Sequence, residues 1–382
     1  MPIHKNTENN KNPYHLVGQQ TANSKRCYPK TAPSIVIAHS PASSERYIGS
    51  PSITILPNGT YVVSHDFFGP AAEHQSAPVT IVYNSFNRGK TWNKISEIKP
   101  LFWNKLFTHQ EKLYSLGIQH EYGNVLLRCS EDGGQTWTQP NDASSGLLKK
   151  GAYHCAPCPV VIHRGRIWRS LELAEGKRPE WCTVVISAPV DSNLLNADSW
   201  TFSEPFSHSW SQSQWIEGNI VVNPSGELLN ILRTNGNGND KAAITHINPS
   251  GLTLSHHQDK DIIHFPGGGV KFTIHFDPKT SRYWSIVNQQ QSVDIGRNNL
   301  VLTSSADLYR WRVDYPLYYH PDKYKHAWQY VDWQIDNDDI VFVSRTAFDD
   351  QYGGAHNDHD ANFLTFHRII NFRNPEARKL AQ

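Results

Sequence analysis

Short apolar runs separated by polar turns recur along the chain from about residue 34 onward. Runs of roughly four to eight apolar or alternating residues are typical of β-strands, and no long segment has helical spacing. Six turn signals each join two such runs: Pro57–Gly59, His109–Lys112, Arg164–Gly165, Pro224–Gly226, Asp277–Arg282 and Asp336–Asp339. A further apolar run follows each hairpin: Thr80–Tyr83, Val125–Arg128, Thr183–Ser187, Ala242–His246, Leu300–Thr303 and Phe363–His367.

This pattern predicts six countable four-stranded units at the spacing of propeller blades. Ser34–Ala38 (SIVIA) is a spare strand that we expect to close the ring against the C-terminal blade. Residues 1–30 are polar and rich in Asn and Lys, which predicts a lead-in segment. No linker divides residues 31–382, so the expected fold class is all-β, a single β-propeller domain.

Two segments repeat the pattern Ser-x-Asp/Asn-x-Gly-x-Thr-Trp, 45 residues apart: Ser85–Trp92 and Ser130–Trp137. The Asp or Asn can bond amides of its own turn, and the Gly can supply a positive φ. These segments resemble the Asp-box of sialidase-like β-propellers. A third copy, Ser305–Trp311, is one residue short and lacks the Gly. Asp-boxes are structural, so we expect no chemistry from them.

The stretch Tyr153–Arg169 (YHCAPCPVVIHRGRIWR) combines reactive residue types with two apolar runs around Arg164–Gly165. We interpret it as the inner hairpin of the third blade, with Tyr153 on the first strand and Arg169 at the end of the second. A hairpin brings its open ends together, so Tyr153 and Arg169 are expected to face one pocket. They would place an acid/base group beside an anion clamp.

Charge and composition narrow the classes of partner. The 36 Lys and Arg balance 35 Asp and Glu, so no net field favours nucleic acid or an anionic membrane. No run approaches the roughly 20 apolar residues of a membrane span, and the N-terminus lacks the apolar core of a signal peptide. We expect a cytoplasmic protein, or a secreted one if a leader was removed. Five cysteines, few and odd in number, argue against a disulfide framework.

The first predicted blade separates two families of propeller enzymes. Sialidases open this blade with an Arg-Ile-Pro element that grips a carboxylate, whereas this chain has Gly49 at the comparable place. Tyr47–Ile53 (YIGSPSI), Leu56–Gly69 (LPNGTYVVSHDFFG) and the Tyr153–Arg169 stretch instead resemble the propeller uronate lyases. These include ulvan lyases and L-rhamnose-α-1,4-D-glucuronate lyases, which are related to propeller α-L-rhamnosidases. The resemblance spans most of the chain and implies seven blades.

The resemblance also implies roles for particular residues. Arg169 is expected to neutralise the uronate carboxylate and Tyr153 to act as acid/base, with its pKa lowered by the nearby guanidinium. The other implied residues are Arg233 as second clamp, His109 as partner acid/base, His65 as a further catalytic candidate, and His154 and His120 as substrate-binding residues. Four of these residues have a structural alternative: a strand aromatic for Tyr153, an ion pair for Arg169, a His–Asp bond for His65 and a solvated side chain for His109.

Two sets of residues have metal-ligand chemistry, although the reaction itself requires no cofactor. The run 356–360 is rich in donors and predicts a calcium or other cation site formed by His356, Asp358, His359 and Asp360. A zinc site of His154, Cys155, Cys158 and His163 is the weaker alternative, because strand alternation sends the two cysteines to opposite faces. A structural calcium or zinc ion is the cofactor expectation.

The sequence therefore predicts a polysaccharide lyase that cleaves a rhamnose–glucuronate linkage by β-elimination. The expected partner is a uronic-acid-containing oligo- or polysaccharide, and the 12 Trp, 16 Tyr and 15 Phe suit sugar stacking as well as strand cores. A propeller glycoside hydrolase, either an α-L-rhamnosidase or a sialidase-like exo-glycosidase, is the alternative. A glycan-binding propeller without catalysis is the third reading.

Overall fold

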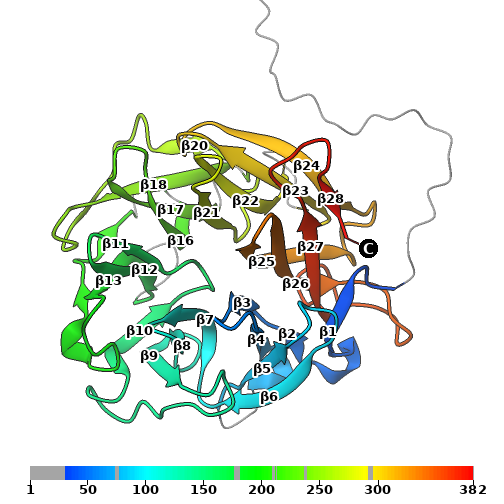
Figure 1. Cartoon of the computed structure of the whole chain (residues 1–382), viewed down its shortest axis with the longest axis horizontal. Helices are drawn as coiled ribbons and strands as arrows, with labels where there is room; N and C mark the ends of the chain where they lie inside the picture. Colours follow the sequence, from blue (N-terminus) through cyan, green and yellow to red (C-terminus); the bar gives the residue numbers. More distant parts are fainter. Residues whose placement is uncertain are drawn as a thin grey trace, which may run out of the picture.

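The strands succeed one another around a ring in the computed structural model (Figure 1). The structure describes residues 31–73, 77–175, 181–208, 211, 213–235, 239–290 and 296–381. The predicted lead-in, residues 1–30, lies outside the described residues. Helix is confined to α1 (Pro70–Glu73) and two short 3-10 turns at Ala42–Ser44 and Ala197–Ser199 within the described residues. None of these helices is long or apolar enough to cross a membrane.

The strands form five antiparallel sheets, and the nine-stranded one, in which β10 also pairs with β12, contains two blades, so the ring has six blades among the described residues. Blade 1 contains β3 (Ser52–Ile55), β4 (Tyr61–Phe68), β5 (Thr80–Ser85) and β6 (Asn93–Ile98), with β2 (Tyr47–Ile48) paired to the end of β4. Blade 2 contains β7 (Phe102–His109), β8 (Lys112–Ile118), β9 (Gly123–Ser130) and β10 (Leu147–His154). Blade 3 contains β11 (Val161–His163), β12 (Arg166–Leu173) and β13 (Cys182–Pro189), whose outer partners are β14 (Thr201–Phe202) and β15 (Phe206–Ser207).

The remaining blades follow the same order. Blade 4 contains β16 (Gln214–Val222), β17 (Leu228–Asn235) and β18 (Lys241–Ile247), whose outer partners are β19 (Leu254–Ser255) and β20 (Ile262–His264). Blade 5 contains β21 (Thr273–Asp277), β22 (Arg282–Asn288), β23 (Asn299–Ser305) and β24 (Trp311–Tyr319). Blade 6 contains β25 (Ala327–Asp336), β26 (Asp339–Ala347), β27 (Phe363–Ile370) and β1 (Ile35–His39), with β28 (Lys379–Leu380) also paired to β27.

The predicted propeller and its closing strand are confirmed. All six predicted turns join the first two strands of a blade, as in the pairs His109 with Lys112 and Asp277 with Arg282. The seven blades implied by the resemblance were wrong for the described residues, which form six. The ring closes after the sixth blade because β1 supplies the outer strand beside β27, so both ends of the chain share one sheet.

The stretch Tyr153–Arg169 is not one hairpin, contrary to the prediction. Tyr153 and His154 end β10, the outer strand of blade 2, whereas Arg169 lies on β12 of blade 3. Pro157 and Pro159 separate the two, and proline cannot donate a ladder hydrogen bond, so the strand stops there. Tyr153 pairs with Leu173, four residues beyond Arg169.

All three Asp-boxes join the third and fourth strands of their blades. In the complete box, Asp132 Oδ1 accepts the Thr136 amide at 2.9 Å, and the Trp137 indole donates to the Gly134 carbonyl at 3.0 Å. The third box reproduces this pattern, because the Trp311 indole donates to Leu308 at 2.8 Å. Leu308 takes the place of the glycine at φ 71°, so the missing Gly did not abolish the box.

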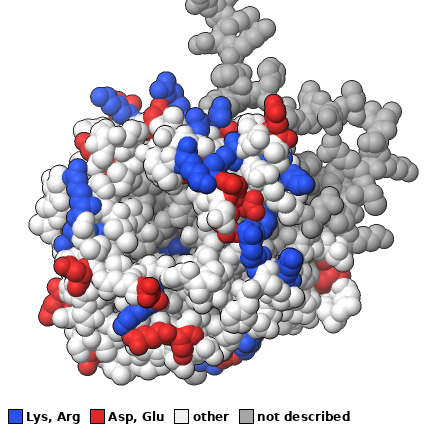
Figure 2. All heavy atoms as spheres, viewed as in Figure 1, with Lys and Arg blue, Asp and Glu red and all other residues white. Residues whose placement is uncertain are grey.

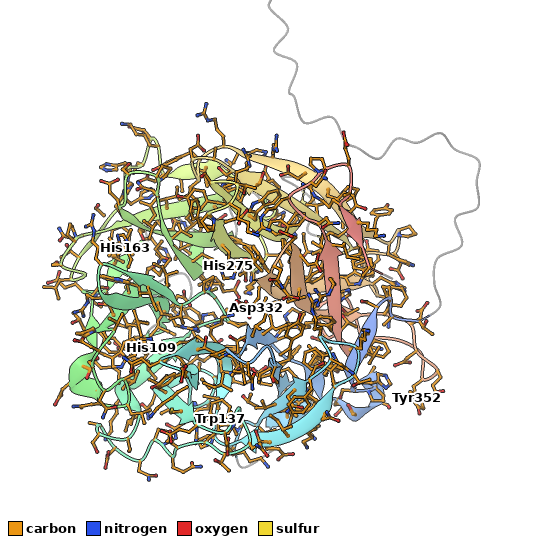
Figure 3. The ribbon with its side chains drawn as sticks, in the orientation of Figure 1. His109, Trp137, His163, His275, Asp332 and Tyr352 are labelled. Carbon is orange, nitrogen blue, oxygen red and sulfur yellow. The ribbon has the colours of Figure 1, made fainter. Side chains whose placement is uncertain are left out.

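Buried polar groups join the inner strands near the ring axis, where Figure 3 places Asp332 and His275. Asp332 on β25 accepts Lys105 Nζ of β7 at 2.5 Å and the Ile53 amide of β3 at 2.8 Å, so one carboxylate ties together blades 6, 2 and 1. Lys271 adds blade 5 by donating to the Val331 carbonyl at 2.7 Å.

Charges of both signs are interspersed over the face seen in Figure 2, as expected from the balanced composition. The same view shows that the ring is hollowed near its centre, with Lys or Arg atoms in the depth of the hollow. A polyanion is therefore not offered a continuous basic surface on this face.

Candidate active site

Three inner strands carry the same local distortion near their starts. Trp103 on β7, Glu217 on β16 and Tyr330 on β25 have φ values of 48°, 57° and 52°. Each coincides with a break in the register of its strand pair. A left-handed non-glycine residue costs about 1–3 kcal/mol, and a β-bulge re-aims the side chain it carries. The repeat in alternate blades, 2, 4 and 6, marks the end of the ring where the inner strands begin; we call it the site end.

Buried carboxylates anchor two of these bulges from the preceding blade. Asp66, at the end of β4, accepts the Trp103 amide at 2.6 Å and the Ser50 amide at 2.9 Å. Glu172, on β12, accepts the Glu217 amide at 2.9 Å. Burial raises the pKa of Asp66 to about 7, although the amides of Trp103 and Ser50 act to lower it. Both carboxylates therefore hold backbone in place and are shielded from solvent.

Glu217, Arg233 and Tyr330 form the centre of the site. Arg233 Nη1 donates to Glu217 Oε2 at 3.0 Å, Arg233 Nε donates to the Gly269 carbonyl at 2.9 Å, and the guanidinium also hydrogen-bonds the Tyr330 side chain. Burial acts to raise the pKa of Glu217, but attraction to Arg233 and His154 outweighs it and the pKa is lowered. The Glu217 carboxylate is therefore ionised beside a partly exposed tyrosine.

Two further arginines face the same tyrosine. The guanidinium carbons of Arg345 and Arg297 lie 4.7 and 5.8 Å from the centroid of the Tyr330 ring. Arg297 donates to Gln329 Oε1, and its Nε lies 3.8 Å from Asp358 Oδ2. Arg345 Nε donates to the His359 carbonyl at 3.1 Å. Burial lowers the pKa of both guanidinium groups, that of Arg345 to about 10, so both remain charged at neutral pH.

These charges do not cancel within the site. Arg233, Arg297 and Arg345 are 8, 9 and 3% exposed and carry three positive charges. Glu217 neutralises one of them, and Asp358, at the rim, approaches a second. Arg345 is attracted by Asp360 and Asp66 but forms no ion pair with either of these carboxylates. A desolvated positive excess favours an anionic ligand, and guanidinium groups match the planar geometry of a carboxylate.

Aromatic side chains line one flank of the site. The Trp103 ring lies 4.5 Å from His154, which lies 5.1 Å from Trp181, and the Trp181 ring lies 5.2 Å from Tyr122. His154 Nδ1 contacts Glu172 Oε2 at 2.6 Å, so the carboxylate that anchors Glu217 also orients this histidine. Trp103 and Tyr122 are partly exposed and offer apolar ring faces to a ligand.

Arg233 and His154 are the predicted residues that the structure brings to this site. Tyr153 and Arg169 are not brought together as predicted. The Arg169 guanidinium is fully buried and donates to the carbonyls of Ala156, at 2.7 Å, and Cys158, at 3.3 Å. Burial and Glu175 raise the pKa of Tyr153, whereas the proposed base role required a lowered pKa. The Tyr153–Arg169 stretch instead forms the connection between blades 2 and 3.

The predicted histidines lie elsewhere. His109 sits at the turn from β7 to β8, at the opposite end of the inner strand, and contacts the Val190 carbonyl at 2.6 Å. Figure 3 shows it toward the rim of the ring. His65 is fully buried on β4, burial lowers its pKa to about 4, and its Nδ1 contacts the Asp66 carbonyl oxygen instead of the Asp66 carboxylate. His120 is exposed on the loop between β8 and β9.

The predicted metal ligands have other partners. Asp360 contacts His356 Nδ1 and His359 Nδ1, both at 2.8 Å, through different oxygens, while Asp358 faces Arg297. The cation site at 356–360 stays a prediction. In the zinc alternative, Cys155 and Cys158 donate to the carbonyls of Trp103 and Glu217, and His163 contacts Gly226 at the far end of blade 4. These four side chains do not converge. None of the four described cysteines forms a disulfide.

Sequence reasoning missed four central residues: Glu217, Arg297, Tyr330 and Arg345. The available signal was a charged residue inside an otherwise apolar strand, as in Glu217 of QWIEGNIVV and Arg345 of DIVFVSRTA. A cavity of about 610 Å³ at the other end of β16 and β21 lacks this chemistry, because its lining is mainly aliphatic and aromatic, including Ile220, Ile274 and Phe276.

No protein-family model matches the chain, and no curated protein matches it by sequence. Solved structures resemble its fold at low identity. Penicillium chrysogenum α-L-arabinanase, complexed with arabinobiose, aligns with a TM-score of 0.58 at 12% identity, covering 92% of this chain and 100% of the arabinanase. The Fusarium graminearum α-L-arabinofuranosidase aligns with a TM-score of 0.57 at 13% identity, covering 87% of this chain and 97% of that one.

Sialidases resemble the chain to a similar degree. Trypanosoma rangeli sialidase aligns with a TM-score of 0.59 at 14% identity, covering 85% of this chain and 55% of the sialidase. Hadza microbial sialidase Hz136 aligns with a TM-score of 0.61 at 12% identity, covering 89% of this chain and 68% of that one. The fold is therefore that of the β-propellers that include these glycoside-processing enzymes.

Proposed function

We propose that the protein is a glycoside hydrolase that acts on a carboxylate-bearing sugar at the site end of the propeller. The observation that carries this proposal is the group of three buried arginines around the Glu217–Tyr330 pair. A neutral sugar does not need three desolvated guanidinium groups, whereas a sugar carboxylate compensates their charge. The proposal replaces β-elimination by hydrolysis and keeps an acidic glycan as substrate.

Tyr330 is the proposed nucleophile. Its hydroxyl attacks the anomeric carbon, the bond to the leaving oxygen breaks as that oxygen takes a proton, and the phenolic proton passes to ionised Glu217. Water, deprotonated by the carboxylate of the general acid, then attacks the anomeric carbon, and the released Tyr330 oxygen takes its proton back from Glu217. Sialidases with a tyrosine nucleophile are known exceptions to the two-carboxylate pattern of glycosidases. A neutral phenol avoids the repulsion that a carboxylate nucleophile would feel from the sugar carboxylate. Arg233 contacts both partners and holds them in register for the transfer.

Asp358 is the proposed general acid. Burial raises its pKa although Arg297 acts to lower it, and its side chain is still 29% exposed at the rim of the site. A raised pKa keeps a carboxylic acid protonated nearer to neutral pH, as proton donation to the leaving oxygen requires. Asp66 is less suited to this role because its carboxylate is fully buried and accepts two backbone amides.

The arginine set differs from the Arg-Ile-Pro arrangement of sialidases. A Cβ added at Gly49 would lie 1.6 Å from Asp66 Oδ1, so an arginine cannot stand there while Asp66 anchors Trp103. Arg345, from blade 6, adds the third guanidinium instead. We therefore expect the carboxylate to lie between blades 4, 5 and 6, leaving the aromatic flank around Trp103 for the leaving group.

A uronate lyase is the second candidate, with residues other than those predicted. Elimination needs a cation to neutralise the carboxylate and a base for the C5 proton, and Arg345 and Tyr330 could serve these roles. The adjacent Glu217 is ionised and can activate a nucleophile, and the fold resembles hydrolases, so both observations support hydrolysis.

The test is a panel of aryl glycosides of sialic acid, glucuronic acid and arabinofuranose, with release of the aryl alcohol as readout. We expect turnover of a carboxylated member and little turnover of the arabinofuranoside. Ulvan and rhamnose-capped glucuronate glycans are assayed in parallel for the ultraviolet absorbance of an unsaturated uronate. An increase in ultraviolet absorbance without release of the aryl alcohol would support a lyase in place of a hydrolase. Turnover of the arabinofuranoside alone would contradict both functions.

Active-site variants link this activity to the proposed site. Tyr330→Phe should lower kcat/KM by about a thousandfold, because the covalent step loses its nucleophile. Arg297→Gln should mainly weaken binding of the carboxylated sugar. Tyr324→Phe is the matched control, since Tyr324 is 72% exposed, and it should keep the wild-type rate. Equal rates for Tyr330→Phe and wild type would remove Tyr330 from the mechanism.

A further inference from the structure

The outer edge of blade 4 contains a second group of chemically reactive side chains. Both β19 and β20 pair with β18, and residues 256–261 bulge outward between them. His246 lies on β18 opposite Ser255, at the place where the bulge leaves the sheet. The bulge ends in a tight turn, in which the Lys260 and Asp261 amides both donate to the His257 carbonyl at 3.0 Å. This turn holds His257 beside Asp261.

We propose that His246, His257 and Asp261 form a binding site for a divalent first-row transition metal ion, for which Zn²⁺ is the best match. One ligand atom from each residue lies within 4.8 Å of the other two. Zinc binds imidazole nitrogen and carboxylate oxygen at about 2.0–2.2 Å, so modest rotation of the two imidazoles brings all three donors to one ion. Three protein ligands leave a fourth position for water.

Asp261 supplies the charge that this site would neutralise. It is 1% exposed, and its Oδ2 accepts the His257 amide at 2.7 Å. His246 Nε2 lies 3.1 and 3.0 Å from its two oxygens. In the described part of the chain, its ion-pair partners are histidines and include no lysine or arginine. A buried carboxylate without a lysine or arginine partner is a favourable ligand for a metal cation.

The two histidines differ from their neighbour His256 in a way that suits this role. The His246 and His257 rings meet at 67° with centroids 5.2 Å apart, and both side chains reach the surface. His256 instead points inward, contacts the Ile244 carbonyl at 2.7 Å and packs on Trp215. His256 therefore packs against the core beneath residues 256–261 and is not one of the proposed metal ligands.

Metal binding would tie the bulge to the outer strand of blade 4. The ion would link β18, through His246, to both ends of the turn, through His257 and Asp261. Metal that binds the folded chain and not the unfolded chain raises stability by mass action. The site lies at the edge of blade 4, away from the Glu217–Tyr330 centre, so we expect the metal to affect stability and not turnover.

The test uses the full-length, metal-free protein titrated with ZnCl₂ in a calorimeter. His257→Gln should weaken zinc binding by about tenfold or more, because a direct ligand contributes at least as much as an outer-shell partner. His257 is exposed, so this substitution leaves the fold intact. His264→Gln is the matched control: His264 is a surface histidine on β20 that pairs with Asp240, and it should leave affinity unchanged. CaCl₂ should bind far more weakly, since calcium prefers oxygen ligands.

A second variant separates this site from the histidine-rich loop of blade 6. His356→Gln should keep the zinc affinity of the wild type. Thermal unfolding gives an independent readout, in which zinc should raise Tm for the wild type and for His264→Gln but not for His257→Gln. Zinc affinity that is unchanged in His257→Gln, or lost in His356→Gln alone, would overturn the proposal, as would the absence of zinc binding to the wild type.

Discussion

Trp103, Glu217 and Tyr330 have left-handed backbone, so a single residue that holds one of these segments in place has a large effect on the site. Asp66 holds the Trp103 bulge by accepting its amide at 2.6 Å, yet burial raises the pKa of Asp66 to about 7. An unfolded aspartate has a pKa of about 3.9. Between these values the unfolded chain has lost this proton while the folded chain keeps it, so the folded state binds more protons and the free energy of unfolding falls as pH rises.

Asp66 therefore predicts a pH-dependent stability difference between wild type and Asp66→Asn. The wild-type advantage should shrink between pH 4.5 and 7, by at most about 1.4 kcal/mol per pH unit, and level off above pH 8. Urea unfolding of both proteins at a series of pH values measures it. An advantage that stays constant or grows with pH would show that Asp66 is ionised throughout this range.

The site residues show which chemistry a linear pattern can reveal. Arg233 was predicted because it lies on a recognisable strand within the region that resembles the lyases, and it does contact Glu217. Tyr153 and Arg169 were misplaced because their spacing was interpreted as a hairpin, while two prolines divert the chain between blades. Glu217 and Tyr330 owe their orientation to bulges, and a bulge inserts one residue without any distinctive sequence signature.

At the scale of elements, the Asp-boxes were predictable because their bonds are local. Ser85 and Ser130 each accept an amide four residues along the chain, so the whole device lies within eight residues. Leu308 departs from the motif because tertiary packing compensates its left-handed backbone: its side chain is fully buried in the core shared by blades 4 and 5.

Two glycines separate backbone strain from packing in these hairpins. Gly89, in the first Asp-box, has φ 87°, and an added Cβ would lie 2.2 Å from the Phe366 ring of blade 6. Gly226 has φ 81° with open space around it. Gly226→Ala should cost about 1–2 kcal/mol for the left-handed backbone, and Gly89→Ala a further 1–3 kcal/mol for the clash. Chemical denaturation measures both, and equal losses would contradict the contact between blades 1 and 6.

At the scale of the whole molecule, the ring depends on charges buried near its axis. Asp332 binds Lys105 at 2.5 Å and the Ile53 amide, which joins three blades through one carboxylate. Asp332→Asn should lower the free energy of unfolding by about 3–5 kcal/mol, because the buried Lys105 loses its counter-charge. Glu131→Gln, which breaks an exposed pair with Lys112, should cost at most about 1 kcal/mol. Similar losses in both variants would refute a central role for Asp332.

The blade pattern and the closing strand followed from the sequence because hairpin turns and strand lengths are local. The site did not, since it brings together residues 217, 297, 330 and 345 from three blades. Their convergence depends on ring closure and on the register of each inner strand, and neither leaves a mark in the spacing of residues along the chain. The expectation of seven blades was wrong for the same reason, because the partner of β1 is fixed only when the ring closes.

The proposed hydrolysis depends on the attack of Tyr330 on the anomeric carbon of a carboxylated sugar. To test this step, the protein is incubated with an activated fluorosugar that carries a carboxylate, such as a difluoro sialic acid, and the labelled peptide is mapped by mass spectrometry. We expect one adduct per chain on the peptide containing Tyr330, and none with Tyr330→Phe. An adduct on another residue would rule out Tyr330 as the nucleophile. Hydrolysis of a carboxylated aryl glycoside by Tyr330→Phe at the wild-type rate would rule it out as well.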